Sequence, residues 1–270
     1  MADEWMGISV NREITSRKMK RLYYIAFSLW LLLPQYALSQ SYKIAHCYGG
    51  CPIGGSVENH LIIRPIYALS YNTTNKSADW VSYKVSIESI GIASSLSRTP
   101  LLDEYVSETL RAVDFLDAES LGFTRAQYVP LVDFAGTPYW NEVNYLTNTV
   151  ARTSSLSQGA WYGLDWSIRN YVNRISEVFV LAGPIFDSTA DAKTLLTDNP
   201  HRVPDRFFKI IITEQGQAAS FILSQEAPVH LHHCEMQSSI AEIEALTHLD
   251  LFPLIPQSLE EAAFENLGCF

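Results

Sequence analysis

Histidine and cysteine are the residue types in this chain with the most direct capacity for metal or redox chemistry. Three of the seven histidines, His230, His232 and His233, lie just before Cys234. The segment from Val229 to His232 alternates apolar and polar residues as a strand does, and a strand would place two imidazoles on one face. Imidazole nitrogens bind zinc and copper, so a metal site is one interpretation. We favour the other, an exposed strand or loop beside a disulfide, because no second cluster of ligands accompanies these histidines.

The four cysteines, Cys47, Cys51, Cys234 and Cys269, are compatible with disulfides or with a metal site. Structural zinc sites typically use two closely spaced ligand pairs, and the second such pair is missing here. An even number of cysteines in an exported chain indicates disulfides, for which three connectivities exist. We favour the local pairing Cys47–Cys51 and Cys234–Cys269, because the glycines inside the first loop allow a tight turn.

Export is indicated by the amino-terminal segment. Basic residues within 18–21 precede an apolar run over 22–33, and Ala37 and Ser39 are small residues at the −3 and −1 positions of a cleavage site. The apolar run is shorter than a comfortable membrane span, which needs about 20 residues. We therefore expect a signal peptide within residues 1–39, a mature chain that begins at Gln40, and a true start at Met19. An uncleaved anchor is the alternative.

The composition indicates a folded protein with a substantial core. The chain has 270 residues, of which 47% are hydrophobic and 18% charged, and this excludes a long disordered or coiled-coil protein. The length suits one domain, which we place at residues 40–270. The net charge of −10 disfavours a generally basic nucleic-acid-binding protein, although a local basic cleft remains compatible with it.

The hydrophobic pattern predicts a mixed α+β domain. A capping box at Ser239 and Glu242 predicts an amphipathic helix over 238–248. Apolar residues at helical spacing predict another helix over 156–173. A shorter helix is expected near 102–112, and a turn at 72–75. Runs rich in β-branched and aromatic residues predict strands at 61–71, 79–85, near 127–134, and at 177–183, 207–213 and 218–223.

Residues 122–171 resemble the active-site region of the DNA/RNA non-specific endonucleases, which are secreted nucleases of the ββα-metal type. This segment contains TRAQ at 124–127, YLTN at 145–148 and LSQGAW at 156–161. Further matches follow the same order along the chain: CPIGGS at 51–56, NKSADWVSYKV at 75–85, VLAGPIF at 180–186, VPDRFFKIII at 203–212, and the surroundings of Cys234 and Cys269, which resemble the family's second disulfide. The resemblance implies a single domain with an antiparallel sheet flanked by helices.

The resemblance also implies a two-part mechanism. In the family, a histidine of a DRGH motif acts as the general base that activates a water molecule against the phosphodiester phosphorus. A hydrated Mg²⁺ ion, held by an asparagine, neutralises the developing charge. Arginines bind the phosphate, and a second asparagine and a carboxylate orient the base and the metal-bound waters.

At the DRGH position this sequence departs from the family. Arg125 is retained as a phosphate contact, whereas Thr124, Ala126 and Gln127 replace the aspartate, the glycine and the general-base histidine. Asn148 matches the asparagine that orients the base. Because an amide side chain has no nitrogen that titrates near neutral pH, Gln127 cannot take a proton from water.

The metal position departs as well. Ser157 replaces the metal-holding asparagine, and its neutral hydroxyl is a weaker Mg²⁺ ligand than an amide carbonyl. Asp165 matches a glutamate that acts through metal-bound water, and Arg169 matches a phosphate-binding arginine. Arg98 is a looser match to another. His201, in a nearby family loop, is expected to be solvated.

Three functions are compatible with these residues: a nuclease-fold protein that binds nucleic acid or phosphate without turnover, an exported structural or partner-binding domain, and an active Mg²⁺-dependent endonuclease with another base. We favour weak or absent catalysis with weakened Mg²⁺ binding. The partner would be DNA or RNA, at an affinity lowered by the acidic charge. The family resemblance is compatible with a homodimer, and we expect a periplasmic or extracellular location and no membrane span in the mature chain. Convergence of Arg98, Arg125, Asn148, Asp165 and Arg169 on one open cleft would favour the functions that involve nucleic acid.

Overall fold

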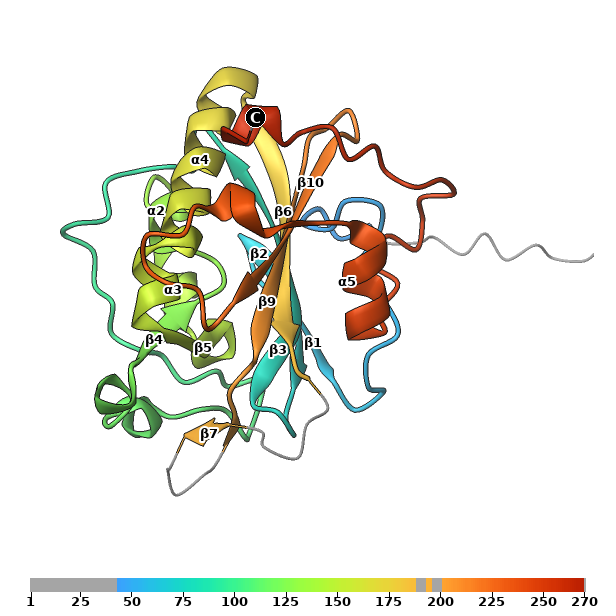
Figure 1. The fold of residues 1–270 in the computed structure, drawn as a ribbon. Coiled ribbons are helices and arrows are strands. Elements are labelled where there is room, and N and C mark those ends of the chain that lie inside the picture. Colours follow the sequence, from blue (N-terminus) through green and yellow to red (C-terminus); the bar gives the residue numbers. More distant parts are fainter. Residues whose placement is uncertain (1–42, 188–192, 196–200, 270) are drawn as a thin grey trace, which may run out of the picture. The chain divides into compact units, whose positions relative to one another are not determined.

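The computed structural model describes residues 43–187, 193–195 and 201–269 (Figure 1). The expected signal peptide and its cleavage site lie outside these residues. Within them, no helix combines the length and the hydropathy that crossing a membrane requires.

The centre of the fold is a seven-stranded antiparallel sheet, as the resemblance implied. Its strands lie in the order β1-β2-β3-β6-β9-β10-β11. Their bounds are His60–Ile63 for β1, Tyr67–Asn72 for β2, Ser77–Ser86 for β3, Glu177–Ile185 for β6, Arg206–Ile212 for β9, Ala218–Ser224 for β10 and Gln237–Ser238 for β11. Four of the six predicted strand regions each coincide with one strand of this sheet.

Two smaller strand pairs accompany the main sheet. Strands β4 (Phe123–Gln127) and β5 (Thr149–Thr153) form an antiparallel pair, which carries the TRAQ segment. Strands β7 (Thr194–Leu195) and β8 (His201–Arg202) form the other.

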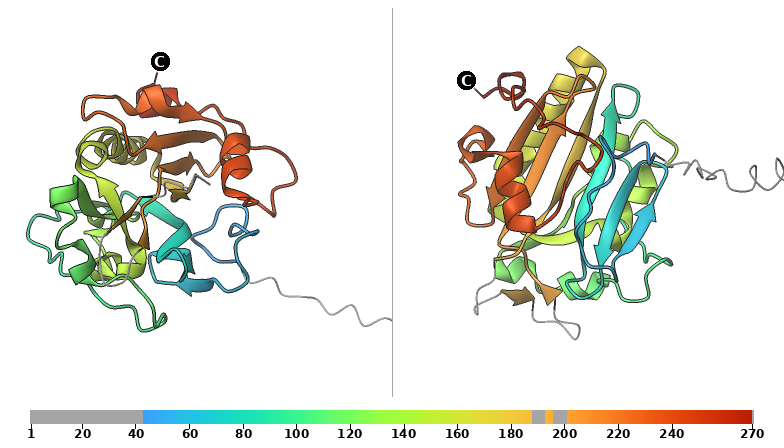
Figure 2. Two further views of the ribbon diagram at one scale, coloured as in Figure 1. Left: turned by 60° about the horizontal axis from the view of Figure 1, so that its bottom comes forward. Right: turned by 90° about the vertical axis from the view of Figure 1, so that its right-hand side faces the viewer.

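Helices cover both faces of the main sheet. Helices α2 (Leu131–Phe134), α3 (Ser154–Gln158) and α4 (Ala160–Ile175) lie on one face, and α5 (Ile240–Thr247) lies on the other (Figures 1 and 2). Single turns of 3₁₀ helix connect these elements: η1 (Ala112–Phe115), η2 (Glu119–Leu121), η3 (Trp140–Asn144), η4 (Leu146–Asn148), η5 (His233–Met236) and η6 (Glu265–Leu267). The capping prediction for α5 is confirmed, because the Ser239 hydroxyl accepts a hydrogen bond from the Glu242 N–H at 3.1 Å.

The sheet separates two hydrophobic cores. The larger core lies on the α4 side and includes every residue of the predicted apolar stripe: Leu156, Trp161, Leu164, Ile168 and Val172. The smaller core lies beneath α5 and includes Ile243 and Leu251. Burial of one apolar stripe on each side is what holds these helices against the sheet.

The helix predicted over 156–173 is interrupted at Gly159, where α3 ends and α4 begins. A Cβ atom at this position would lie 2.4 Å from the Val229 carbonyl oxygen, so only glycine fits the close approach of the two backbones. Because Gly159 is not helical, α3, which carries Ser157, does not continue the axis of α4.

Three other local predictions are wrong. The strand predicted at 61–71 is two strands, because the chain reverses at residues 64–66, where Pro65 fixes the backbone. The strand predicted near 127–134 lies earlier, at β4, and gives way at Pro130 to α2. The helix expected near 102–112 is largely irregular chain, in which the Asp103 carboxylate accepts hydrogen bonds from the Tyr105 N–H, Arg64 and the Thr147 hydroxyl.

Both expected disulfides are present. Cys47–Cys51, here called the N-terminal disulfide, closes a separation of 4 residues. Cys234–Cys269, the C-terminal disulfide, closes a separation of 35 and ties η5 to the end of the chain.

Candidate functional site

The β4–β5 strand pair positions the candidate site. Its register places Gln127 opposite Thr149 and Thr124 opposite Arg152. Helix α3 follows β5 directly, with the Thr153 hydroxyl as its N-cap, and brings Ser157 back to the same strand pair. The motif residues therefore meet through local chain geometry.

Gln127 is held as a hydrogen-bond donor. Its Nε2 donates to the Val143 carbonyl at 2.8 Å and contacts Asn144 Oδ1 at 3.3 Å. The fully buried Asn148 donates to the same Val143 carbonyl at 2.9 Å and accepts from the Val129 N–H at 3.0 Å. Asn148 thus orients the loop that Gln127 binds, and the Gln127 amide nitrogen is not basic because its lone pair is delocalised into the carbonyl group.

Ser157 is engaged by a residue that the sequence analysis did not identify. The Ser157 hydroxyl accepts a hydrogen bond from Arg152 Nε at 3.1 Å and lies 3.2 Å from the Thr124 hydroxyl. Arg152 is only 5% exposed, and its guanidinium lies 3.8 Å from the centre of the Trp161 ring. Burial lowers the pKa of Arg152 to about 10, and the charge of Asp165 opposes this shift.

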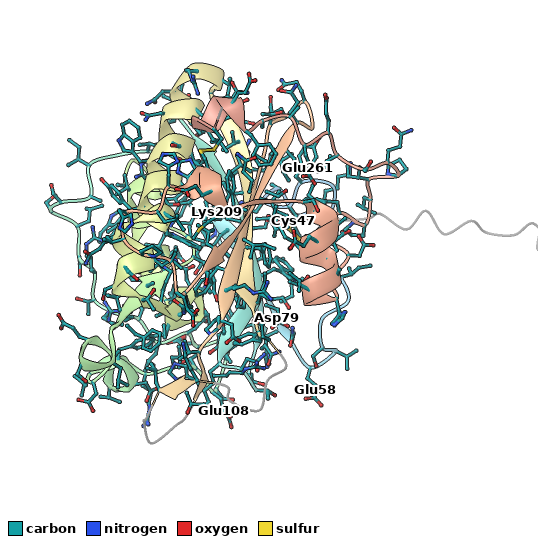
Figure 3. The ribbon with its side chains drawn as sticks, in the orientation of Figure 1. Cys47, Glu58, Asp79, Glu108, Lys209 and Glu261 are labelled. Atoms are coloured by element: carbon teal, nitrogen blue, oxygen red, sulfur yellow. A yellow bond between two sulfur atoms is a disulfide. The ribbon has the colours of Figure 1, made fainter. Side chains whose placement is uncertain are left out.

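Asp165 forms a buried ion pair with Lys209, another residue that the sequence analysis missed. Lys209 lies on β9, and its side chain is enclosed between the sheet and α4 (Figure 3). Its ammonium lies 3.7 Å from the Trp161 ring centre. Burial lowers the pKa of Lys209, and Asp165 counteracts this. A lone lysine inside the apolar strand FFKIII was the sequence signal for such a pair.

Arg169, one turn after Asp165, is also paired. Its Nη1 lies 3.0 Å from Asp133 Oδ1, and Asp133 is buried. Burial first, and then the charge of Asp165, raise the pKa of Asp133 to about 7, while Arg169 pulls it down. We call the five residues Asp133, Arg152, Asp165, Arg169 and Lys209 the buried charge cluster.

Arg98 and Arg125 are the exposed cations of the predicted set. Arg125 Nη2 donates to the Arg98 carbonyl at 2.9 Å, so the two residues are neighbours on the surface. Asn148 and Asp165 are buried by contrast, and the Arg169 side chain, paired with the buried Asp133, is 13% exposed. The five residues expected to share one open cleft therefore divide into an exposed arginine pair and an interior group.

The side chains at the expected metal position do not fit a divalent cation. The Ser157 hydroxyl is a neutral ligand that already bonds a guanidinium, and the Asp165 carboxylate bonds an ammonium. Magnesium requires several hard oxygen ligands in octahedral arrangement, and an adjacent positive charge opposes its binding.

His230 and His232 are exposed and lie in a loop, as we favoured, whereas the expectation is wrong for His233, which lies in η5 and is buried. A ring nitrogen from each of His232 and His233 lies within 4.8 Å of Cys234 Sγ, but that sulfur is in the disulfide. His233 is buried, with Nε2 3.0 Å from the Leu267 carbonyl oxygen. The prediction that His201 is solvated is wrong: it is 4% exposed, and its ring centre lies 5.9 Å from that of Phe115.

Comparison with known proteins gives consistent results. The profile of the family described as DNA/RNA non-specific endonuclease matches residues 50–258. A nuclease of Serratia marcescens is 30% identical over 90% of this chain and 94% of its own length. The mitochondrial endonuclease G of Bos taurus is 25% identical over 74% of this chain and 70% of its own. A crystal structure of the EndoG/EndoGI complex has a chain with a similar fold, with a TM-score of 0.65 at 19% identity over 75% of this chain and 89% of that chain.

Proposed function

Because the chain belongs to the DNA/RNA non-specific endonuclease family, we propose that it is an exported member that binds nucleic acid but cleaves it slowly or not at all. The observation that carries the proposal is that the Gln127 side chain acts as a hydrogen-bond donor. Its amide donates to Val143 and Asn144 at the position where the family has a general base. General-base assistance is worth about 10²–10⁴-fold in rate, so its loss predicts a weak enzyme.

Retained binding is supported by Arg98 and Arg125. Both are exposed and adjacent, and guanidinium groups bind phosphate oxygens in bidentate geometry. The acidic net charge of the chain works against polyanion binding at long range, so the expected affinity is modest and strongly dependent on salt.

A cleavage assay tests the catalytic part. The oxidised chain that starts at Gln40 and the Serratia nuclease are incubated with plasmid DNA and with RNA, in Mg²⁺, Mn²⁺ or EDTA. We expect a rate at least about 10²-fold below that of the relative, the low end of what a missing base costs. Gln127→Ala should leave this low rate unchanged. Robust EDTA-sensitive cleavage that survives Gln127→Ala would contradict the proposal, because another residue would then supply the base.

A binding assay tests the other part. Titration of a fluorescent oligonucleotide at several salt concentrations should show that Arg98→Ala with Arg125→Ala weakens binding and flattens the salt dependence. Arg174→Ala, at an exposed arginine near the end of α4, is the matched control and should change binding little. Equal losses from both changes would refute a specific role for the Arg98–Arg125 pair.

Export is tested by mass spectrometry of secreted material, which should begin at Gln40. The two disulfides and the expected signal peptide within residues 1–39 support this part of the proposal. An intact segment 22–33 in the exported protein would contradict cleavage.

A further inference from the structure

We infer that the Arg152 guanidinium takes the place of a divalent cation in this site, so that the positive charge is supplied by the chain itself and metal binding is excluded. The inference deepens the proposed function and rests on it, because it concerns the same site. Arg152 does not match any residue that the family resemblance identified, and the inference follows from its contacts alone.

One side chain connects the two altered positions. Arg152 Nε donates to the Ser157 hydroxyl at 3.1 Å, and Arg152 Nη1 lies 3.5 Å from the main-chain carbonyl oxygen of Gln127. Ser157 and Gln127 stand where the metal-holding asparagine and the general base were expected. The Arg152 guanidinium therefore bonds the side chain at the metal position and lies against the backbone at the base position, which places a positive charge where the metal ion was expected.

Arg152 is fixed in this place by its surroundings. It is 5% exposed, its guanidinium lies over Trp161, and its backbone is paired with Thr124 in the β4–β5 register. The Thr124 hydroxyl is within 3.2 Å of both the Ser157 hydroxyl and the Arg152 carbonyl oxygen. A side chain held at several points cannot move aside for a metal ion without losing these contacts.

The charge of Arg152 persists at neutral pH. Burial lowers its pKa to about 10, which still leaves the guanidinium protonated, and the nearby Asp165 favours the charged form. A divalent ion bound to the Ser157 oxygen would face this charge at close range in a region of low dielectric, where repulsion is strong.

Mn²⁺ binding tests the inference without relying on cleavage. Electron paramagnetic resonance reports free Mn²⁺, and titrations compare the unmodified mature chain, Ser157→Asn, Arg152→Gln with Ser157→Asn, and Arg152→Lys with Ser157→Asn. Glutamine keeps a donor for its neighbours but removes the charge, whereas lysine keeps the charge. We expect Arg152→Gln with Ser157→Asn to gain one Mn²⁺ site that binds at least about 100-fold more tightly than Ser157→Asn alone does. This factor equals about 2.8 kcal/mol at 1.4 kcal/mol per tenfold. Arg152→Lys with Ser157→Asn should gain no Mn²⁺ site.

Three results would overturn the inference. Either Ser157→Asn alone or Arg152→Lys with Ser157→Asn binds Mn²⁺ as tightly as Arg152→Gln with Ser157→Asn, or the folded Arg152→Gln, Ser157→Asn variant gains no Mn²⁺ site. Circular dichroism and the thermal midpoint establish that each variant is folded. If Arg152→Gln with Ser157→Asn fails to fold, the unmodified chain provides the test. Stoichiometric Mn²⁺ binding that raises the thermal midpoint of the unmodified chain and is lost in Ser157→Ala would refute the exclusion of metal. The absence of such binding would support it. Failure of the proposed function would appear as cleavage by the unmodified chain, which is a different measurement.

Discussion

Replacement of Lys209 by methionine tests the energetics of the buried charge cluster directly. The Lys209 side chain is completely buried and that of its partner Asp165 is 9% exposed. Methionine fills similar volume but leaves the Asp165 carboxylate without its hydrogen-bonded cation. Removal of one partner of a buried ion pair costs about 3–5 kcal/mol, and we expect a loss of free energy of unfolding in this range.

The surroundings set where in that range the value falls. Asp133 is a second carboxylate near Asp165, and its repulsion increases the penalty of the lost ammonium. Arg152 is a remaining cation whose interaction with Asp165 reduces it. These two opposing charges leave the middle of the range, about 4 kcal/mol, as our expectation. Lys209→Met with Asp165→Leu removes both charges and should recover most of the loss, because apolar replacement of a buried pair is often neutral.

Urea unfolding at pH 7, with both disulfides intact, measures these effects. Lys84→Met is the matched control, since Lys84 pairs with Glu177 at 2.9 Å but their side chains are 39% and 21% exposed. A surface pair contributes about 0–1 kcal/mol, so the control should lose little. Equal m values across the variants would show that the unfolding transitions are comparable. If Lys209→Met costs no more than Lys84→Met, the buried pair does not have the energetic role that its burial implies.

Three further predictions concern catalysis, pH and the disulfides. Gln127→His with Ser157→Asn should restore measurable Mg²⁺-dependent plasmid cleavage only when Arg152→Gln is added, because the base, the metal ligand and a site free of competing charge are all required. Restoration by Gln127→His with Ser157→Asn while Arg152 is retained, or by either change alone, would contradict this. Burial raises the pKa of Asp133 to about 7, well above its unfolded value of about 3.9. Between these two values the folded chain retains a proton that the unfolded chain releases. The stability that this proton contributes is therefore lost as pH rises from about 4 through 7. Asp133→Asn should therefore flatten the fall of the thermal midpoint across this window in calorimetry, and an unchanged slope would show that the group is not responsible. Removal of the C-terminal disulfide by serine substitution should cost about 4 kcal/mol in chemical denaturation, against about 2 kcal/mol for the N-terminal disulfide, because it closes the longer loop; equal losses would point to local contacts instead of loop entropy.

The parts of the fold that local sequence determines were predicted well. The Ser239 cap of α5 and the apolar stripe of α4 depend on residues within a few turns of one another, and both are confirmed. Errors occurred where a distant backbone decides the conformation. The break at Gly159 is imposed by the carbonyl of Val229, which is far away in the sequence and unknown to any local pattern.

The same distinction applies to the site. The family resemblance was sufficient to select Gln127 and Ser157, and they lie near each other because β4, β5 and α3 are close in the chain. The partners of the charged residues could not be found in this way. Lys209 is separated from Asp165 by 44 residues, and Asp133 from Arg169 by 36, so only the packed structure brings them together. The lysine within FFKIII indicated a buried charge but not its counterion.

The separation of the β4–β5 pair from the main sheet has a consequence for how such a protein changes over generations. Gln127 and Thr124 lie on this small strand pair, whereas the seven-stranded sheet and the α5 core are built from other residues. Exchange of a site residue therefore leaves most of the scaffold's packing untouched. In a fold of this kind, residues on the small strand pair can be exchanged while selection for correct folding of the main sheet continues.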